Sequence, residues 1–310
     1  MNVFILIGPH KTGTTAVQRF LNENGERIND KGYYFESSLL NRRVDERFYV
    51  ELKESLDKAS RDGYKNYILV NERLLGLYNN GYQYKRDFSN NLNKSIPSEF
   101  NIKISITFRR QDSFLESAYM QLIHQGESRS FDDFYKANHS SFDWLEYLDC
   151  VTSVFGPESV IPYEYKGDNA ISNFLSFSGI EIQYIENKKD LQNKSYGQLA
   201  FDIAIIVNKT SSAAENKIIR TELQTKLNSS IINKAELISA SRISELKCIY
   251  SSGNKTIHDK YSGFSTVFFR FDSKYDVNLP RDESDVTVAL SSLYSLMARS
   301  NIDLNDEITF

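Results

Sequence analysis

Short apolar runs alternate along the chain with longer segments in which apolar residues recur every three or four positions. The first run, residues 3–7, is apolar throughout and ends at Gly8. A run of this length is typical of a strand that is buried on both faces of a sheet. Similar runs occur at residues 67–70, 102–108 and 159–161. The pattern therefore predicts four strands.

Helical periodicity begins at Thr14, where Val17, Phe20 and Leu21 share one face of the predicted helix. A second helix is predicted directly after the strand at 102–108, with Asp112 as its candidate N-cap. The chain thus opens with a strand, a loop and a helix, and the same order returns later.

Strands that alternate with helices are typical of an α/β fold with a parallel central sheet flanked by helices. Further helical patterns occur at residues 171–179, 195–208 and 215–241. After Cys248 the pattern is weak and predicts no element. We therefore predict a single domain over residues 1–310, with a helical C-terminal part from about residue 170.

Composition narrows the class of protein. With 25% charged and 40% hydrophobic residues, the chain is typical of a soluble globular protein, and its net charge of −4 gives no general attraction to nucleic acid or to an anionic membrane. The first apolar run is too short for a signal peptide or a transmembrane segment. Cys150 and Cys248 are too few for a disulfide framework or a zinc site. We expect a cytoplasmic protein without a bound metal, and the sequence leaves its oligomeric state open.

The loop between the first strand and the first helix carries the strongest chemical signal. It reads Gly8-Pro9-His10-Lys11-Thr12-Gly13-Thr14-Thr15. Backbone N–H groups at a helix N-terminus attract anions, and glycines let the backbone wrap closely around one. Lys11 adds a full positive charge, and the threonine hydroxyls add donors. The loop predicts a phosphate site, the alternative being a turn that only caps the helix.

This loop differs from the phosphate loop of nucleoside triphosphatases. Gly8 and Gly13 have the spacing of that motif, but Thr14 stands where its lysine belongs, and the lysine comes before the second glycine. A kinase on the same fold, which would need ATP and Mg²⁺, is therefore disfavoured and is kept as an alternative.

The strand, the loop and the helix together resemble the phosphosulfate-binding segment of P-loop-like sulfotransferases, with bacterial members the nearest in form. The resemblance implies a donor, 3′-phosphoadenosine 5′-phosphosulfate (PAPS), which leaves as 3′-phosphoadenosine 5′-phosphate (PAP), and it requires no metal. It implies that Lys11 is the catalytic cation. The residues implied to hold the donor's 5′ end are Gly8, His10, Lys11, Thr12, Gly13, Thr14 and Thr15.

The resemblance also implies an arginine after a later strand and a serine eight residues on, which bind the donor's 3′-phosphate. Arg109 and Ser117 have this spacing, which favours Arg109 over Arg110. The planar guanidinium suits two phosphate oxygens and keeps its charge. The alternative is that both arginines are solvated charges at a strand end. Ala16 stands where animal cytosolic members carry a tryptophan, which leaves the adenine contact unassigned.

A sulfuryl acceptor needs a general base. The family often places one after the second core strand, where this chain has Glu72. Glu36, which follows the aromatic residues 33–35, is the second candidate. A pairing of Glu72 with Arg73 at the strand end is the alternative role. The segment Asn193-Lys194-Ser195 weakly resembles a further motif of the bacterial proteins.

The family's habits and the aromatic content indicate a carbohydrate or glycolipid hydroxyl as the acceptor. Residues 79–93, which mix aromatic and polar side chains, are a candidate acceptor loop. Besides the kinase, a non-catalytic protein that binds PAP or another nucleotide remains as an alternative. We therefore expect a PAPS-dependent sulfotransferase with a small-molecule or glycan acceptor and no nucleic-acid partner.

Overall fold

The computed structural model describes most of the chain, which divides into two compact units. The described residues are 1–40, 42–167, 169–182, 196–210, 223 and 237–271. The first unit comprises residues 1–115, 137–190 and 241–272, and the second comprises residues 116–136, 191–240 and 273–310. Whether the chain is one domain stays a prediction.

The elements follow the expected alternation of strands and helices. The strands are β1 (Asn2–Ile7), β2 (Tyr33–Tyr34), β3 (Asn66–Val70), β4 (Asn101–Phe108) and β5 (Val160–Glu164). The α-helices are α1 (Thr14–Glu23), α2 (Gly25–Asp30), α3 (Glu46–Arg61), α4 (Lys85–Ser95), α5 (Gln111–His124), α6 (Phe131–Asn138), α7 (Trp144–Phe155), α8 (Ala170–Ser178), α9 (Gln198–Thr210), α11 (Ala240–Lys260) and α12 (Val267–Arg270). The described residues also form the short 3₁₀ turns η1 (Ser37–Leu39), η2 (Tyr78–Asn80) and η3 (Pro157–Ser159).

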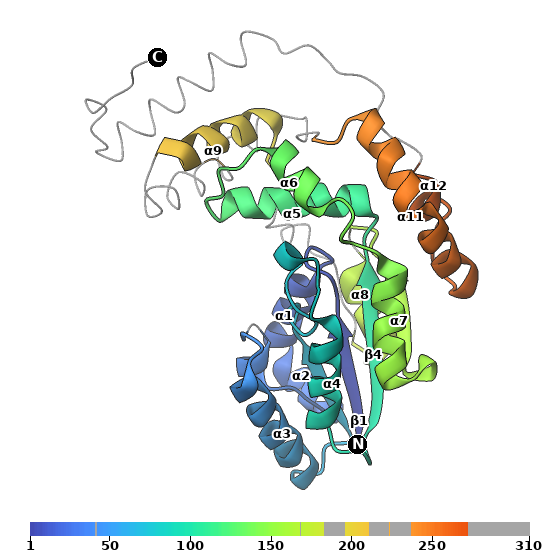
Figure 1. Ribbon diagram of the computed structural model, residues 1–310. Coiled ribbons are helices and arrows are strands. Elements are labelled where there is room, and N and C mark those ends of the chain that lie inside the picture. Colours follow the sequence, from blue (N-terminus) through green and yellow to red (C-terminus); the bar gives the residue numbers. More distant parts are fainter. Residues whose placement is uncertain (41, 168, 183–195, 211–222, 224–236, 272–310) are drawn as a thin grey trace, which may run out of the picture. The chain divides into compact units, whose positions relative to one another are not determined.

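The five strands form one parallel sheet in the order β2-β3-β1-β4-β5, so the predicted α/β fold with a parallel central sheet is confirmed. Figure 1 shows β1 and β4 side by side in this sheet. In register, Ile5 lies opposite Leu69 of β3 on one side and Ile104 of β4 on the other. The outer strands differ from the inner ones: β2 has two residues, and β5 contains Pro162.

Helices cover both faces of the sheet. Successive residues of β1 point to opposite faces, so Phe4 and Leu6 share one face. On this face Phe4 packs edge-on against Phe177 of α8, and Leu6 joins a buried apolar cluster with residues of α1 and α8. On the other face, the hydroxyl of Tyr67 in β3 hydrogen-bonds to Ser55 of α3 at 2.8 Å. The apolar strands are therefore buried on both sides, as their continuous apolar pattern predicted.

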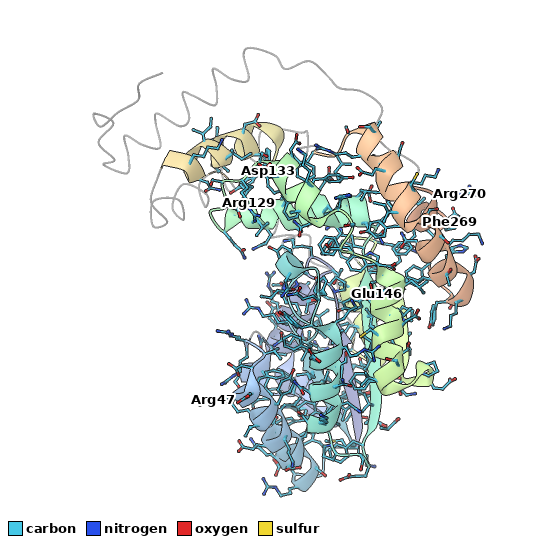
Figure 2. The ribbon with its side chains drawn as sticks, in the orientation of Figure 1. Arg47, Arg129, Asp133, Glu146, Phe269 and Arg270 are labelled. Atoms are coloured by element: carbon cyan, nitrogen blue, oxygen red, sulfur yellow. The ribbon has the colours of Figure 1, made fainter. Side chains whose placement is uncertain are left out.

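Helices α4 and α7 pack together in the first unit. Lys85 of α4 forms an ion pair with Glu146 of α7, with an N–O distance of 2.8 Å; Glu146 is labelled on α7 in Figure 2. Helix α4 and turn η2 fill much of residues 79–93, so the prediction of a loop there is wrong for the part from Lys85 onwards. The proposed contact of residues 79–93 with an acceptor stays a prediction.

A buried pair of amides joins α5 to α11. Gln111 Nε2 donates to Asn254 Oδ1 at 3.0 Å, and Asn254 Nδ2 donates back to Gln111 Oε1 at 2.8 Å. Each amide also donates to a backbone carbonyl, Gln111 to Phe142 and Asn254 to Phe268. Both side chains are at most 1% exposed. This pair fixes a helix that the sequence pattern did not predict, because α11 continues well past Cys248.

The described residues of the second unit have an aromatic core of their own. The ring of Tyr119 on α5 lies 5.1 to 5.9 Å from the rings of Phe131, Phe134 and Phe201. Asn208 of α9 donates to the carbonyls of Ile123 and Glu127. These contacts tie α9 to α5 and α6 inside this unit.

The remaining sequence predictions have mixed outcomes. The helices predicted at 171–179 and 195–208 correspond to α8 and α9, whereas most of residues 215–241 lies outside the described residues. Asp112 lies inside the first turn of α5, where Arg110 binds its carboxylate, and not at the helix N-cap. Among the described residues, no helix has the length and apolar character needed to cross a membrane.

The amide pair makes a prediction for stability. Asn254→Ala should lower the free energy of unfolding by about 2–4 kcal/mol, because Gln111 loses its two hydrogen bonds to Asn254 and the Phe268 carbonyl loses its donor. Thr256→Ala, an exposed change on the same helix, should cost less than about 1 kcal/mol. Urea unfolding of the full chain measures both. Equal effects of the two changes would show that the amide pair does not hold α11.

Candidate active site

The carboxyl ends of the parallel strands bring the predicted groups to one edge of the sheet. The loop 8–13 follows β1, Glu72 follows β3, and Arg109 follows β4. Strand β1 is also where the chain order changes direction, since β3 lies on one side of it and β4 on the other. Ligands of open α/β sheets bind outside the carboxyl ends of the strands at this switch point.

Two glycines let the loop close tightly after β1. Gly13 has φ +88° just before α1, and a Cβ there would lie 2.4 Å from Cβ of Ala170. A Cβ on Gly8 would lie 2.4 Å from the Thr12 hydroxyl, which donates to the Pro9 carbonyl. In the described part of the chain, no side chain caps this end of α1, and its first turn has no acidic residue. The first-turn N–H groups and the positive end of the helix dipole suit an anion.

Lys11 is held in a conformation that costs free energy. Its φ is +69°, in the left-handed region that side chains other than glycine rarely occupy. Such strain persists only where surrounding contacts impose it. One of these contacts is on Lys11 itself, since Arg109 Nη1 donates to the Lys11 carbonyl at 3.4 Å.

Tyr82 holds the loop at His10, the residue before Lys11. Its hydroxyl accepts the backbone N–H of His10 at 2.9 Å and lies 3.1 Å from His10 Nδ1. Tyr82 is 2% exposed and itself has φ +55°, directly after turn η2. The imidazole of His10 also meets the ring of Tyr78 edge-on, 5.0 Å away. His10 is therefore part of the folded frame of the loop.

Lys11 and Arg109 place two cations together at the edge of the sheet. Burial lowers the pKa of Lys11, and the nearby Arg109 lowers it further, while Glu72 acts in the opposite direction. The guanidinium of Arg109 lies 5.3 Å from the ring centre of Tyr165 and donates from Nε to Ser113 at 2.6 Å. An anion between the two cations would relieve their mutual repulsion.

Arg109 and Arg110 have different surroundings. Trp144 Nε1 donates to the Arg109 carbonyl at 2.7 Å, which anchors the end of β4. Arg110 instead makes two hydrogen bonds to Asp112, of 2.7 and 2.6 Å, and donates to the Val267 carbonyl. Arg109 therefore contacts the loop through the Lys11 carbonyl, and the preference for Arg109 as a phosphate ligand stays a prediction.

Glu72 faces the loop from the end of β3. Its Oε1 lies 4.0 Å from Nε2 of His10, and its side chain is 29% exposed. Burial raises the pKa of Glu72, and Arg73 and Lys11 offset part of this shift. Asn71 fixes the strand end, because its buried amide donates to the carbonyls of Leu39 and Arg42 and accepts the N–H of Arg73.

The other predicted residues are less closely connected to the loop. Glu36 accepts hydrogen bonds from Tyr34 at 3.1 Å and from the Ser38 hydroxyl at 3.2 Å, and caps turn η1. Ser117 lies on α5 within the second unit. The segment 193–195 lies outside the described residues. The roles of Glu36 and Ser117 stay predictions.

Sequence reasoning missed three residues that shape this edge. Tyr82 contacts the loop, and Tyr165 contacts Arg109, each from a distant part of the chain. Ser113 binds the Arg109 side chain from the first turn of the following helix. The spacing from Arg109 to Ser113 was visible in the sequence. Nothing in the sequence distinguished Tyr82 among 19 tyrosines.

Comparison with solved structures returns matches that include two proteins of low identity. A solved sulfotransferase from Alicyclobacillus acidocaldarius is 13% identical with a TM-score of 0.45, and the match covers 87% of this chain and 99% of that one. A retinol dehydratase in complex with androsterone and inactive cofactor PAP is 10% identical with a TM-score of 0.29, over 98% and 83% of the two chains. No family model and no curated protein matches the chain. The case for a shared chemistry therefore rests on the residues themselves.

The buried imidazole makes stability depend on pH. Burial, with Arg73 and Lys11 nearby, lowers the pKa of His10 from 6.5 to about 4. The unfolded chain therefore binds a proton at this site below pH 6.5, whereas the folded chain binds it only near pH 4. Stability should fall as the pH drops through this window, by about 3 kcal/mol in all.

Urea unfolding of the wild type and His10→Asn measures this effect. The difference between the two free energies of unfolding should change by about 3 kcal/mol between pH 4 and 6.5 and stay constant above 6.5. Repeating both unfolding measurements in a Glu72→Gln background removes any contribution from the titration of Glu72. Tyr78 and Tyr82 stay neutral between pH 4 and 6.5. A constant difference across the window would mean that His10 is not buried as a neutral imidazole.

Proposed function

We propose that the protein is a PAPS-dependent sulfotransferase that transfers a sulfuryl group to a hydroxyl acceptor. The observation that carries the proposal is the pair of cations, Lys11 and Arg109, at the N-terminus of α1. A helix N-terminus, two cations and a tight glycine loop form a site for a compact, multiply charged anion.

The residues present fit the donor. A Cβ on Gly8 would meet the Thr12 hydroxyl, and a Cβ on Gly13 would meet Ala170 at the start of α8, so only glycines allow the tight turn that a phosphate-binding loop needs. Lys11 and the threonines of the loop would hold the 5′ end. Arg109 and Ser117 remain the proposed ligands of the 3′-phosphate. Because Arg109 also contacts the Lys11 carbonyl, it would link the two ends of the donor site.

The chain's own groups supply positioning and charge. Bound PAPS supplies an activated sulfuryl group. Lys11 would stabilise the negative charge that develops on the leaving phosphate oxygen, as positioned cations do in phosphoryl transfer. Glu72 would accept the proton of the acceptor hydroxyl, and its raised pKa favours this role over that of a permanently ionised carboxylate.

The proposal also extends to the chemical class of the acceptor. We propose a carbohydrate or glycolipid hydroxyl, on the basis of the many aromatic side chains and the habits of the family that the loop resembles. Turn η2 and the start of α4 follow Glu72 along the chain and include the exposed Tyr84. This segment is the proposed place of acceptor contact, in a cytoplasmic enzyme.

Calorimetric titration with PAP tests the donor site. The wild type should bind PAP, and Arg109→Ala should weaken binding about tenfold or more, because a charge-assisted contact is lost. Arg47→Ala is the matched control: Arg47 lies on α3, its side chain is 79% exposed, and it is labelled in Figure 2. Binding of ATP–Mg²⁺ without binding of PAP would overturn the proposal and favour a kinase.

Turnover tests the chemical roles. In Lys11→Ala, kcat should fall about 100-fold or more, while PAP affinity falls far less. In Glu72→Gln, kcat should fall by a similar factor with PAP affinity unchanged. Glu36→Gln is the comparison, because Glu36 is the second candidate base. Normal turnover in Lys11→Ala contradicts the mechanism, and PAP binding without transfer to any acceptor would identify a non-catalytic binding protein.

A further inference from the structure

We propose that Tyr82 is a positioning residue: its hydroxyl holds the loop after β1 through the backbone of His10 and fixes the His10 imidazole as the Nε2–H tautomer, with that N–H on the side of Glu72. The part of this inference that concerns catalysis rests on the proposed function. The hydrogen-bond assignment stands independently of it.

The argument begins with the one proton of the Tyr82 hydroxyl. The oxygen accepts the backbone N–H of His10 at 2.9 Å, and Nδ1 of the same residue lies 3.1 Å away. A phenol that accepts from a backbone N–H still has its own proton to donate. Tyr82 is 2% exposed, so leaving this proton unpaired would be costly. Nδ1 is the acceptor within reach, and it must then carry no proton.

The second nitrogen supports the same tautomer. A neutral imidazole has one N–H, so an unprotonated Nδ1 places the proton on Nε2. Nε2 lies 4.0 Å from Oε1 of Glu72. That distance is too long for a hydrogen bond, but the N–H dipole on this side stabilises a carboxylate. The opposite tautomer would turn a lone pair toward Glu72 and leave the Tyr82 proton without a partner.

The surrounding charges keep the imidazole neutral. Lys11 in the loop and Arg73 at the end of β3 both oppose a positive charge on His10, and burial does the same. Among the described residues, the carboxylate that lies against the imidazole is that of Glu72, at 4.0 Å. Tyr82 thus acts on Glu72 through His10, and on the anion-binding loop through the backbone of His10.

Tyr82→Phe removes the hydroxyl and keeps the ring. Tyr147→Phe is a matched control, because the Tyr147 ring lies 5.5 Å from that of Tyr82, and its buried hydroxyl has no hydrogen-bond partner in the described structure. The readout is the ¹⁵N spectrum of the imidazoles in the full-length labelled protein at pH 7. His10→Asn identifies the His10 signals among those of four histidines.

We expect the wild type to show His10 as the Nε2–H tautomer, favoured about tenfold or more. Tyr82→Phe should give a mixture of tautomers, and Tyr147→Phe should leave the signals unchanged. An Nδ1–H tautomer in the wild type would overturn the proposal without any variant. Unchanged His10 signals in Tyr82→Phe would also overturn it.

PAP titration and a pH profile test the functional half. Tyr82→Phe should weaken PAP binding about three- to tenfold, since the loop N–H loses its acceptor. It should also shift the acidic limb of the kcat profile to higher pH, because Glu72 loses a stabilising dipole. Wild type that binds no PAP would overturn the proposed function but leave the tautomer result intact. Unaltered PAP affinity and an unaltered pH profile in Tyr82→Phe would overturn the positioning role.

Discussion

The geometry of this site depends on the burial of β1 between two parallel neighbours. Because β3 and β4 pair with it on both sides and helices cover both faces, the direction in which the chain leaves the strand is fixed. The loop must then turn sharply to enter α1. That turn requires positive φ at Gly13 and imposes it on Lys11. The tight turn of the loop thus follows from the packing of the sheet.

A second consequence of the parallel arrangement is electrostatic. Groups that are far apart in the sequence meet at one edge, and two of them, Lys11 and Arg109, have the same charge. The folded chain contains this repulsion, the strained backbone of Lys11 and the buried neutral imidazole of His10. Each of these features lowers the stability of the folded chain, and an anion at the helix N-terminus would offset the repulsion between the two cations. The fold itself therefore holds these groups in place, which would reduce the entropy lost if an anion bound there.

The sequence predicted those parts of the structure that depend on local patterns. Strands β1 and β3 follow from continuous apolar runs, β4 from apolar residues at every second position, and the loop between β1 and α1 from the glycine spacing. Helix α11 was missed because Asn254 occupies a buried position on its inner face, between Tyr250 and Ile257. Its amide is satisfied by Gln111, and no periodicity of apolar residues can signal such a pair. Tyr82 was missed for a related reason, because a contact across 72 residues leaves no local trace.

The two outer strands of the described sheet bear on how the protein behaves at high concentration. An exposed strand edge offers unpaired N–H and C=O groups to a strand of another molecule, which is a common start of aggregation. Here β2 has only two residues, and β5 carries Pro162, which lacks an N–H. Neither strand is a good template for intermolecular pairing. The short β2 and the proline of β5 thus protect the sheet from growing by addition of strands, at little cost to the central strands that hold the site.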